Sequence, residues 1–490
     1  MKAISSQREA DYIGVREGIA TYKKRRGRSI HLQGIENFLV NRRWIITALH
    51  IIMILFYLSL ILIPPLLPRA PESAGPFNNF VLFSHFIFWY IWWPLVVLSM
   101  ILFGRAWCGF LCPEGALSAY ASPFGGNLPV PNWMKWGGIP LLAFIAITIF
   151  GQLVGVYEYP KPQLLILGGS TLLAIIFNLI YTRSGWVWCR YLCPVSLLFG
   201  VFSRLGALHF RVDHRKLAEF DKNNPGKGAR KDPCPVFIYL PNLSTNRYCL
   251  MCFRCANWKG SIHLSMRRPG EELLNINYCE PLFWEVIFLF GAIGLPLGVF
   301  HWTVDPLFIQ LKYILGSVGL NLGLGKLMAY GGPWWLMSHY PEVGEVFYLL
   351  DAVTIVVFIL AAVLLSLGLL SLLTAISTQL LLPRMQEKVD FKELFTRIGY
   401  LYTPISLFSL FLGLSQLTFG YFQQNGLEKE IVYLIRAALL ATGALWSLYL
   451  GFRIIRLQKV WSRPGLVYLP HFVGISLIIA AWYPVLFSGW

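Results

Sequence analysis

The chain has 490 residues, of which 56% are hydrophobic and only 13% are charged. An ordinary soluble protein carries roughly 25% charged residues, so this composition excludes a soluble globular enzyme. Apolar runs of roughly 20 residues, the length that crosses the hydrocarbon core of a bilayer, recur along the whole chain. The sequence therefore predicts an all-α polytopic membrane protein.

Nine runs are long and apolar enough to be transmembrane helices. The first run is too long for a signal peptide and lacks a small-residue cleavage site, so we expect it to remain as an anchor. The nine predicted spans cover residues 44–63, 80–103, 136–156, 164–181, 283–300, 346–373, 398–422, 431–452 and 466–487.

The net charge of +17 is unevenly distributed between the loops. Residues 1–43 contain ten Lys and Arg against four Asp and Glu, and residues 204–268 contain thirteen against four. Positively charged loops remain in the cytoplasm, which predicts a membrane protein with a cytoplasmic N-terminus and an external C-terminus. We expect these basic segments to contact anionic lipid headgroups. No nucleic-acid-binding module is visible, so nucleic acid is not an expected partner.

Nine cysteines all fall on the predicted cytoplasmic side. Structural disulfides belong to the oxidising side of the membrane, so clustered thiols in the reducing compartment indicate metal or redox chemistry. The cysteines are Cys108, Cys112, Cys189, Cys193, Cys234, Cys249, Cys252, Cys255 and Cys279.

Cys249, Cys252 and Cys255 form a C-x2-C-x2-C run, which is typical of a ferredoxin cluster site. In bacterial ferredoxins the fourth thiolate comes from a remote cysteine followed by proline, and Cys234 precedes Pro235. We therefore predict that these four cysteines bind one 4Fe-4S cluster. A zinc site is the alternative, although four-cysteine zinc sites favour two separated C-x2-C pairs.

A second cysteine pattern is repeated at the membrane surface. The segment 107–113, Trp-Cys-Gly-Phe-Leu-Cys-Pro, reappears in residues 188–194 as Trp-Cys-Arg-Tyr-Leu-Cys-Pro. Proline is favoured at the first position of a helix, so each motif predicts a helix directly after its second cysteine. The four cysteines of the two copies, Cys108, Cys112, Cys189 and Cys193, match the ligand set of a second 4Fe-4S cluster. Two redox dithiols or a Cu(I) site are the alternatives.

With these motifs the chain resembles the membrane-bound polyferredoxins of the NapH, NosR and CcoG type. Their hallmark is a pair of Cys-x3-Cys-Pro motifs beside transmembrane helices, followed by a cytoplasmic ferredoxin segment. The resemblance covers residues 42–277. It implies electron transfer from a quinol or a cytoplasmic donor to a respiratory enzyme, or a role in the maturation of copper-containing respiratory enzymes.

The resemblance and the cysteine pattern together predict four segments. Residues 1–43 are a basic cytoplasmic segment, residues 44–203 a four-span membrane domain with both Cys-x3-Cys-Pro motifs, residues 204–281 a cytoplasmic iron–sulfur segment, and residues 282–490 a five-span membrane domain. Cys279 is left over just before the fifth predicted span, either as a spare ligand or as a buried residue.

Ionisable residues inside the predicted spans are candidate functional groups. The histidines His50, His85, His301, His339 and His471 leave haem b or a quinone site open, without direct support. Asp351 and Arg436 lie a few residues inside the outer ends of two spans, and an unpaired charge there is costly. We expect these two residues to form an ion pair.

The predicted function is electron transfer between a quinol or cytoplasmic donor and a respiratory redox partner protein. The alternative is a maturation factor or copper reductase that uses the Cys-x3-Cys-Pro thiols as exchangeable ligands. A cluster-stabilised scaffold or transporter is a third interpretation. No catalytic residue is predicted.

Overall fold

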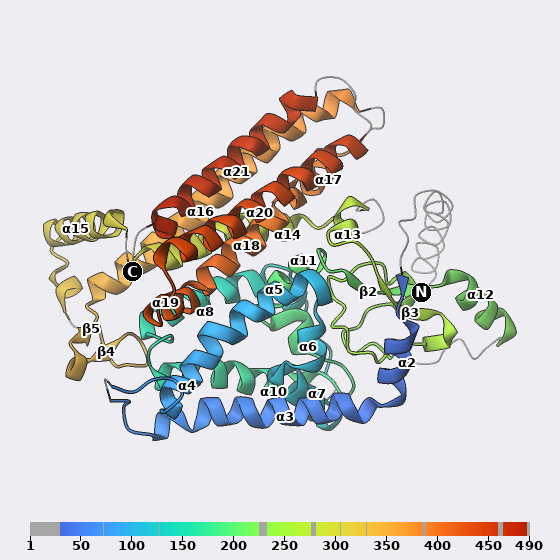
Figure 1. Cartoon of the computed structure of the whole chain (residues 1–490), viewed down its shortest axis with the longest axis horizontal. Helices are drawn as coiled ribbons and strands as arrows, with labels where there is room; N and C mark the ends of the chain where they lie inside the picture. Colours follow the sequence, from blue (N-terminus) through green and yellow to red (C-terminus); the bar gives the residue numbers. More distant parts are fainter. Residues whose placement is uncertain are drawn as a thin grey trace.

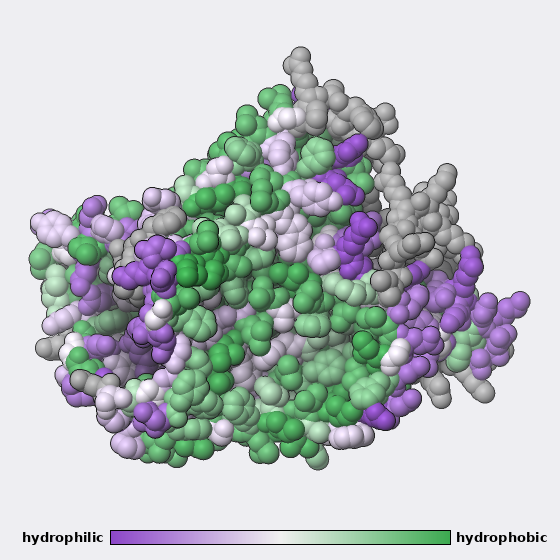
Figure 2. All heavy atoms as spheres, viewed as in Figure 1, coloured by the Kyte–Doolittle hydropathy of each residue, from purple (hydrophilic) through white to green (hydrophobic). Residues whose placement is uncertain are grey.

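A computed structural model describes residues 30–71, 73–126, 128–224, 233–275, 281–303, 305–329, 331–385, 389–458 and 464–487. Apolar side chains cover the middle of the molecule, and hydrophilic side chains gather at its two ends (Figure 2). This distribution fits a protein whose middle lies in a bilayer and whose ends meet water. The predicted all-α polytopic fold is confirmed.

Eight of the nine predicted spans are helices long and apolar enough to cross a membrane. The third, α8 (Ile139–Val154), has 16 residues, which rise only ~24 Å at 1.5 Å per residue. The eight spans are α3 (Arg43–Leu62), α4 (Phe80–His85) continuing into α5 (Trp93–Phe103), α9 (Pro160–Gln163) continuing into α10 (Gly169–Tyr181), α14 (Phe283–His301), α16 (Leu349–Leu381), α17 (Phe391–Gly399) continuing into α18 (Thr403–Leu414), α20 (Lys429–Leu457) and α21 (Pro464–Phe487).

The spans form two layers that share one core (Figure 1). Helices α3, α5 and α10 lie on one side, α16, α20 and α21 lie on the other, and α14 and α18 pack between them. One continuous cluster of buried side chains includes Trp92 and Phe199 from the N-terminal half and Phe288 and Tyr402 from the C-terminal half. The two halves are therefore packed into a single body.

Short helices follow both Cys-x3-Cys-Pro motifs, as predicted. After the first motif, α7 (Pro113–Ala121) begins at its proline and packs against α3 and α10. After the second motif, α11 (Ser196–Ser203) is buried along its whole length and packs against α5 and α14. Each motif thus turns the chain back into the helical bundle.

A small sheet marks the hydrophilic end at the right of Figure 1. Its strands are β1 (Ile30–His31), β2 (Leu208–Val212) and β3 (Ile262–Met266), in the antiparallel order β1-β3-β2. Helices α2 (Gln33–Asn41), α12 (His214–Asn223) and α13 (Glu271–Leu274) complete this end. The sequence did not predict these strands, because the segment contains no long alternating pattern.

The opposite hydrophilic end carries α15 (Pro306–Asn321), α19 (Gln416–Gln424) and a hairpin of β4 (His339–Tyr340) with β5 (Glu345–Val346). Residues 306–346 thus form a second polar end, opposite β1–β3 (Figure 1).

The expected ion pair between Asp351 and Arg436 is wrong. Asp351, at the start of α16, pairs instead with Lys312 of the neighbouring α15 and accepts a hydrogen bond from the Tyr348 N–H at 2.9 Å. Arg436 lies on α20, which packs against α18 and α21. Sequence position placed both charges near the same membrane face, but the two residues face different helices.

A buried ion network joins the hydrophilic end with the sheet to the C-terminal helices. Glu285, at the start of α14, is fully buried and pairs with Arg204 (Nη2 to Oε2, 2.9 Å) and with Arg247. The Tyr400 hydroxyl donates to the same carboxylate. Glu272 of α13 receives Arg204 and Arg267. One carboxylate of α14 thus pairs with two guanidinium groups outside its own helix.

Glu285→Ala would leave Arg204 and Arg247 buried without this counter-charge. Removing one partner of a buried pair costs about 3–5 kcal/mol, so we expect a clear drop in the thermal unfolding midpoint in detergent. The matched control is Glu393→Ala, because Glu393 pairs with Arg397 at a partly exposed site, where an ion pair contributes about 0.3–0.5 kcal/mol. Equal losses in the two variants would contradict the role assigned to Glu285.

Candidate functional site

The structure gathers eight of the nine cysteines around two cavities. Cys108, Cys112, Cys189 and Cys193, here called the repeat thiols, all line one cavity. Cys234, Cys249, Cys252 and Cys255, here called the loop thiols, all line another. The grouping is the one expected from the sequence. Cys279 and residues 1–29, most of the predicted basic segment, lie outside the described residues.

Helix geometry positions the repeat thiols. Cys108 lies in α6 (Ala106–Phe110), and Cys112 caps α7, where its Sγ accepts a hydrogen bond from the Gly115 N–H at 3.4 Å. Cys189 is buried in a π-helical turn that ends just before Cys193. The two copies of the motif therefore present their sulfurs from short turns of different shape.

Backbone conformation positions the loop thiols. Met251 and Phe253, which lie between the cysteines, have positive φ angles of 55° and 58°. This left-handed conformation is uncommon for residues other than glycine. Alternating right- and left-handed residues point successive N–H groups into one concavity, a geometry that suits anionic iron–sulfur sites. The loop thus has the shape that a cluster requires.

Each set of four thiols lines a cavity, and every other residue lining the cavity of the loop thiols is apolar. Four cysteine thiolates are the usual ligands of a 4Fe-4S cluster.

Burial controls the protonation of these thiols. It raises the pKa of the Cys249 thiol to about 12 and also raises the pKa values of Cys112, Cys189, Cys193, Cys252 and Cys255. Metal ligation requires thiolates, so iron binding here must release these protons.

The two sets of thiols touch through the backbone. A Cβ atom on Gly109 would lie 2.2 Å from the Leu250 carbonyl oxygen and 3.0 Å from the Cys252 Cα. The Trp186 N–H also donates to the Pro235 carbonyl at 2.7 Å. Leu250 and Cys189 belong to one hydrophobic cluster, against which thiols of both sets pack. Both cavities are therefore parts of one compact centre.

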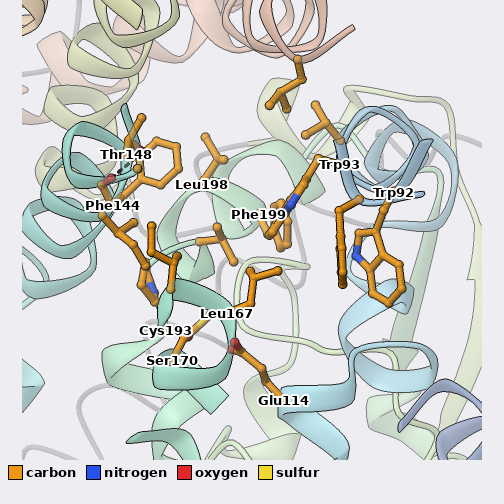
Figure 3. A pocket seen from close by; sticks show the side chains of 18 of the residues that line it. Trp92, Trp93, Glu114, Phe144, Thr148, Leu167, Ser170, Cys193, Leu198 and Phe199 are labelled. Carbon is orange, nitrogen blue, oxygen red and sulfur yellow. Dashed lines mark hydrogen bonds between the residues drawn. The ribbon is translucent and has the colours of Figure 1, made fainter. Parts of the chain in front are cut away.

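The cavity of the repeat thiols extends far into the membrane layer and has a volume of about 210 Å³. Figure 3 shows Cys193, Ser170 and Glu114 on one side, Trp92 and Trp93 on a second, and Phe144 and Thr148 of α8 on a third. Leu295 and Pro296 of α14 and Leu410 and Leu414 at the end of α18 also line it. The cavity is thus lined by residues of both halves of the chain and is mostly apolar.

Few polar groups face this cavity. Glu114 accepts a hydrogen bond from the Trp188 Nε1 at 3.4 Å. Burial raises the pKa of the Glu114 carboxyl, and hydrogen bonds from Ser170 and Trp188 oppose this shift. The indole N–H groups of Trp89 and Trp93 are buried without a partner.

The candidate histidines do not gather in this cavity. The His50 Nε2 lies 3.0 Å from the Gly109 carbonyl oxygen, and the His471 Nδ1 lies 3.2 Å from the Tyr402 hydroxyl. His301 packs edge-on against Trp482, and both ring nitrogens of His85 lack a partner. His339 belongs to the hairpin at the far end. None of these contacts joins two of the five histidines.

The sequence missed two features of this centre. Arg105 lines the cavity of the repeat thiols and is only 3% exposed. The repeat offered no signal for it, because Trp186 occupies the corresponding position of the second copy. The tryptophans Trp89, Trp92 and Trp93 suit an interfacial belt by their sequence position, but here they line the cavity.

Comparison with known proteins points to the segments that contain the repeat thiols. Two segments, 86–131 and 166–213, match the family model of a 4Fe-4S binding domain. Each segment contains one Cys-x3-Cys-Pro motif. The resemblance to membrane-bound polyferredoxins is confirmed. This chain is a multi-pass membrane protein with a 4Fe-4S binding domain.

Three relatives match part of the polyferredoxin-like chain. The putative electron transport protein YccM of Escherichia coli is 24% identical over 207 residues, 36% of this chain and 55% of that protein. The uncharacterized protein MJ0749 of Methanocaldococcus jannaschii is 26% identical over 184 residues, 35% and 68% of the two chains. The methylamine utilization ferredoxin-type protein MauN of Methylorubrum extorquens is 26% identical over 136 residues, 25% and 46%.

The chain thus spans about half the length of YccM and of MauN. No solved structure matches it significantly.

The close backbone contact in this polyferredoxin-like centre predicts the effect of Gly109→Ala. Its Cβ would collide with main-chain atoms of the loop, which have no room to move aside. We expect the iron content per purified chain to fall by about half or more, because thiols of both sets depend on this contact. The control is Gly169→Ala on α10, where nothing lies within 4 Å of an added Cβ. Unchanged iron in Gly109→Ala would show that the contact is not required.

Proposed function

We propose that this chain is a membrane-bound electron-transfer protein with two 4Fe-4S clusters, one held by the repeat thiols and one by the loop thiols. The observation that carries the proposal is the arrangement of eight cysteines as two sets of four, each around its own cavity. When bound, a cluster of this type accepts and donates single electrons. The name of YccM, a putative electron transport protein, agrees with this function.

The chain's own residues hold the two sets close together and keep them dry. Gly109 allows α6 to lie directly on the loop at Leu250 and Cys252. Apolar side chains such as Phe210 and Leu243 surround the loop thiols. Exclusion of water lowers the local dielectric and protects cluster sulfur from hydrolysis.

The centre lies at the hydrophilic end that carries β1–β3, where the predicted cytoplasmic segment 204–281 emerges. We place this end in the cytoplasm of a bacterial inner membrane, because residues 204–268 contain thirteen basic and four acidic residues. Of the four segments predicted from the sequence, residues 1–43 and 204–281 would then lie in the cytoplasm as an iron–sulfur cap. Residues 44–203 and 282–490 would be the two membrane domains beneath it. A respiratory redox protein would be the partner in electron transfer.

The cavity of the repeat thiols favours a quinone or quinol as the membrane-side partner. A lipid-soluble redox carrier needs an apolar cavity at membrane depth with a few polar groups, and this cavity offers both. Glu114, Thr148 and Ser170 are among its polar lining residues. Among the described residues, no histidine lines this cavity, so the cavity itself offers no ligand of that kind for a haem b.

Iron and acid-labile sulfide per chain test the two-cluster proposal. Anaerobically purified protein should contain about eight iron atoms. Cys108→Ser and Cys252→Ser should each remove about half of this iron, because each destroys one four-thiolate set. Cys279→Ser is the control and should retain the full content.

About four iron atoms in the unsubstituted chain would contradict the second cluster. Copper that binds to the repeat thiols and is lost in Cys108→Ser with unchanged iron would favour the maturation or copper-reductase role instead.

Filling the cavity tests the quinone assignment. Thr148→Phe places a ring in the cavity lining, and we expect reduction of the cysteine-bound iron by a short-chain quinol to slow about tenfold, equivalent to about 1.4 kcal/mol. Thr442→Phe is a matched control, because Thr442 also donates to the carbonyl four residues earlier but lies exposed on α20. Equal quinol rates in both variants, with iron and dithionite reduction unchanged, would exclude this cavity as the quinol site.

A further inference from the structure

We propose that Arg105 is a shared counter-charge for the two sets of thiols and raises the reduction potentials of both bound clusters. This inference rests on the two-cluster proposal above. Arg105 lies outside the cysteine motifs, and its effect is measured as the midpoint potentials of the bound clusters.

Arg105 lies between the two sets. It ends the turn between α5 and α6, and its carbonyl accepts the Cys108 N–H at 3.0 Å. Its side chain lines the cavity of the repeat thiols. Its Nη1 donates to the Arg247 carbonyl at 2.9 Å, two residues before Cys249. The guanidinium therefore connects the first Cys-x3-Cys-Pro motif to the loop thiols.

The charge of Arg105 has no carboxylate partner among the described residues. Its side chain forms none of the ion pairs found there, and its Nε is buried without a hydrogen-bond partner. Arg204 and Arg247, which are similarly buried, are paired with Glu285. A buried unpaired charge is costly, so Arg105 needs an anion that the acidic residues around it do not supply.

Geometry places the Arg105 side chain beside both sets of thiols. It lines the same cavity as Cys108, Cys112, Cys189 and Cys193. Its hydrogen bond to the Arg247 carbonyl holds the guanidinium next to the chain two residues before Cys249. A cluster ligated by four thiolates would supply, at each site, the negative charge that this buried cation lacks.

The effect on potential follows from charge. Reduction adds one negative charge to a cluster that already carries four thiolates, and net charge and hydrogen bonding help to set its potential. A cation buried in a region of low dielectric stabilises the added charge far more than one in water. Arg105 should therefore make both clusters easier to reduce.

The test is a redox titration of the purified full-length protein, with the reduced clusters monitored by EPR spectroscopy. Arg105→Gln should lower both midpoint potentials by at least about 59 mV, which is a tenfold change in a one-electron equilibrium. Arg105→Lys, which keeps the charge, should restore most of the difference. The control is Arg254→Gln, which removes an exposed charge beside Cys255. Solvent screens that charge, so its effect should be much smaller.

Each outcome decides the proposal. Unchanged potentials in an Arg105→Gln protein with full iron content would overturn it, as would equal shifts in the Gln and Lys variants. If Arg105→Gln fails to retain iron, Arg105→Lys decides: native iron and potentials support a requirement for charge, and loss of iron in both variants assigns Arg105 a shape-dependent role. The iron content of the unsubstituted protein tests the two-cluster proposal separately.

Discussion

The direct contact between the backbone at Gly109 and the loop at Leu250 is the constraint on which the rest of the centre depends. It brings a turn at the end of a membrane helix against a loop that follows about 140 residues later in the chain. The glycine, the short helices that begin after each motif, and the sheet that anchors the loop all serve this approach. Side chains alone could not hold two thiol sets this close, because a Cβ atom at the contact has no space.

Cysteine spacing predicted how the thiols group around the two cavities because each motif is local in the sequence. The pairs in 107–113 and 188–194 and the run at 249–255 each carry their own geometry, and hydrophobic length predicted the spans equally well. Arg105 could not be predicted, because its role depends on neighbours that come from distant segments. The prediction of an Asp351–Arg436 ion pair was wrong for the same reason. The sequence indicates how deep a residue lies in the membrane, but it does not indicate which helices face each other.

The C-terminal half is part of the centre, although it contributes no cysteine. Glu285 pairs with both Arg204 and Arg247, and Arg247 lies two residues before Cys249. Leu295, Pro296 and Leu414 line the cavity of the repeat thiols. The sequence provided no motif for either role, since a buried carboxylate at a helix start and a few apolar residues are common in any membrane helix. Their significance appears only when the two halves are packed together.

The wall of this cavity extends beyond the part of the chain that the family model describes. The relatives named above match at most 36% of its length, and the 4Fe-4S family model covers residues 86–131 and 166–213. Helices α14 and α18 lie outside those segments, yet they line the same cavity. A fragment that ended after the second motif would therefore lack part of this wall, and apolar surface beside the repeat thiols would be left uncovered.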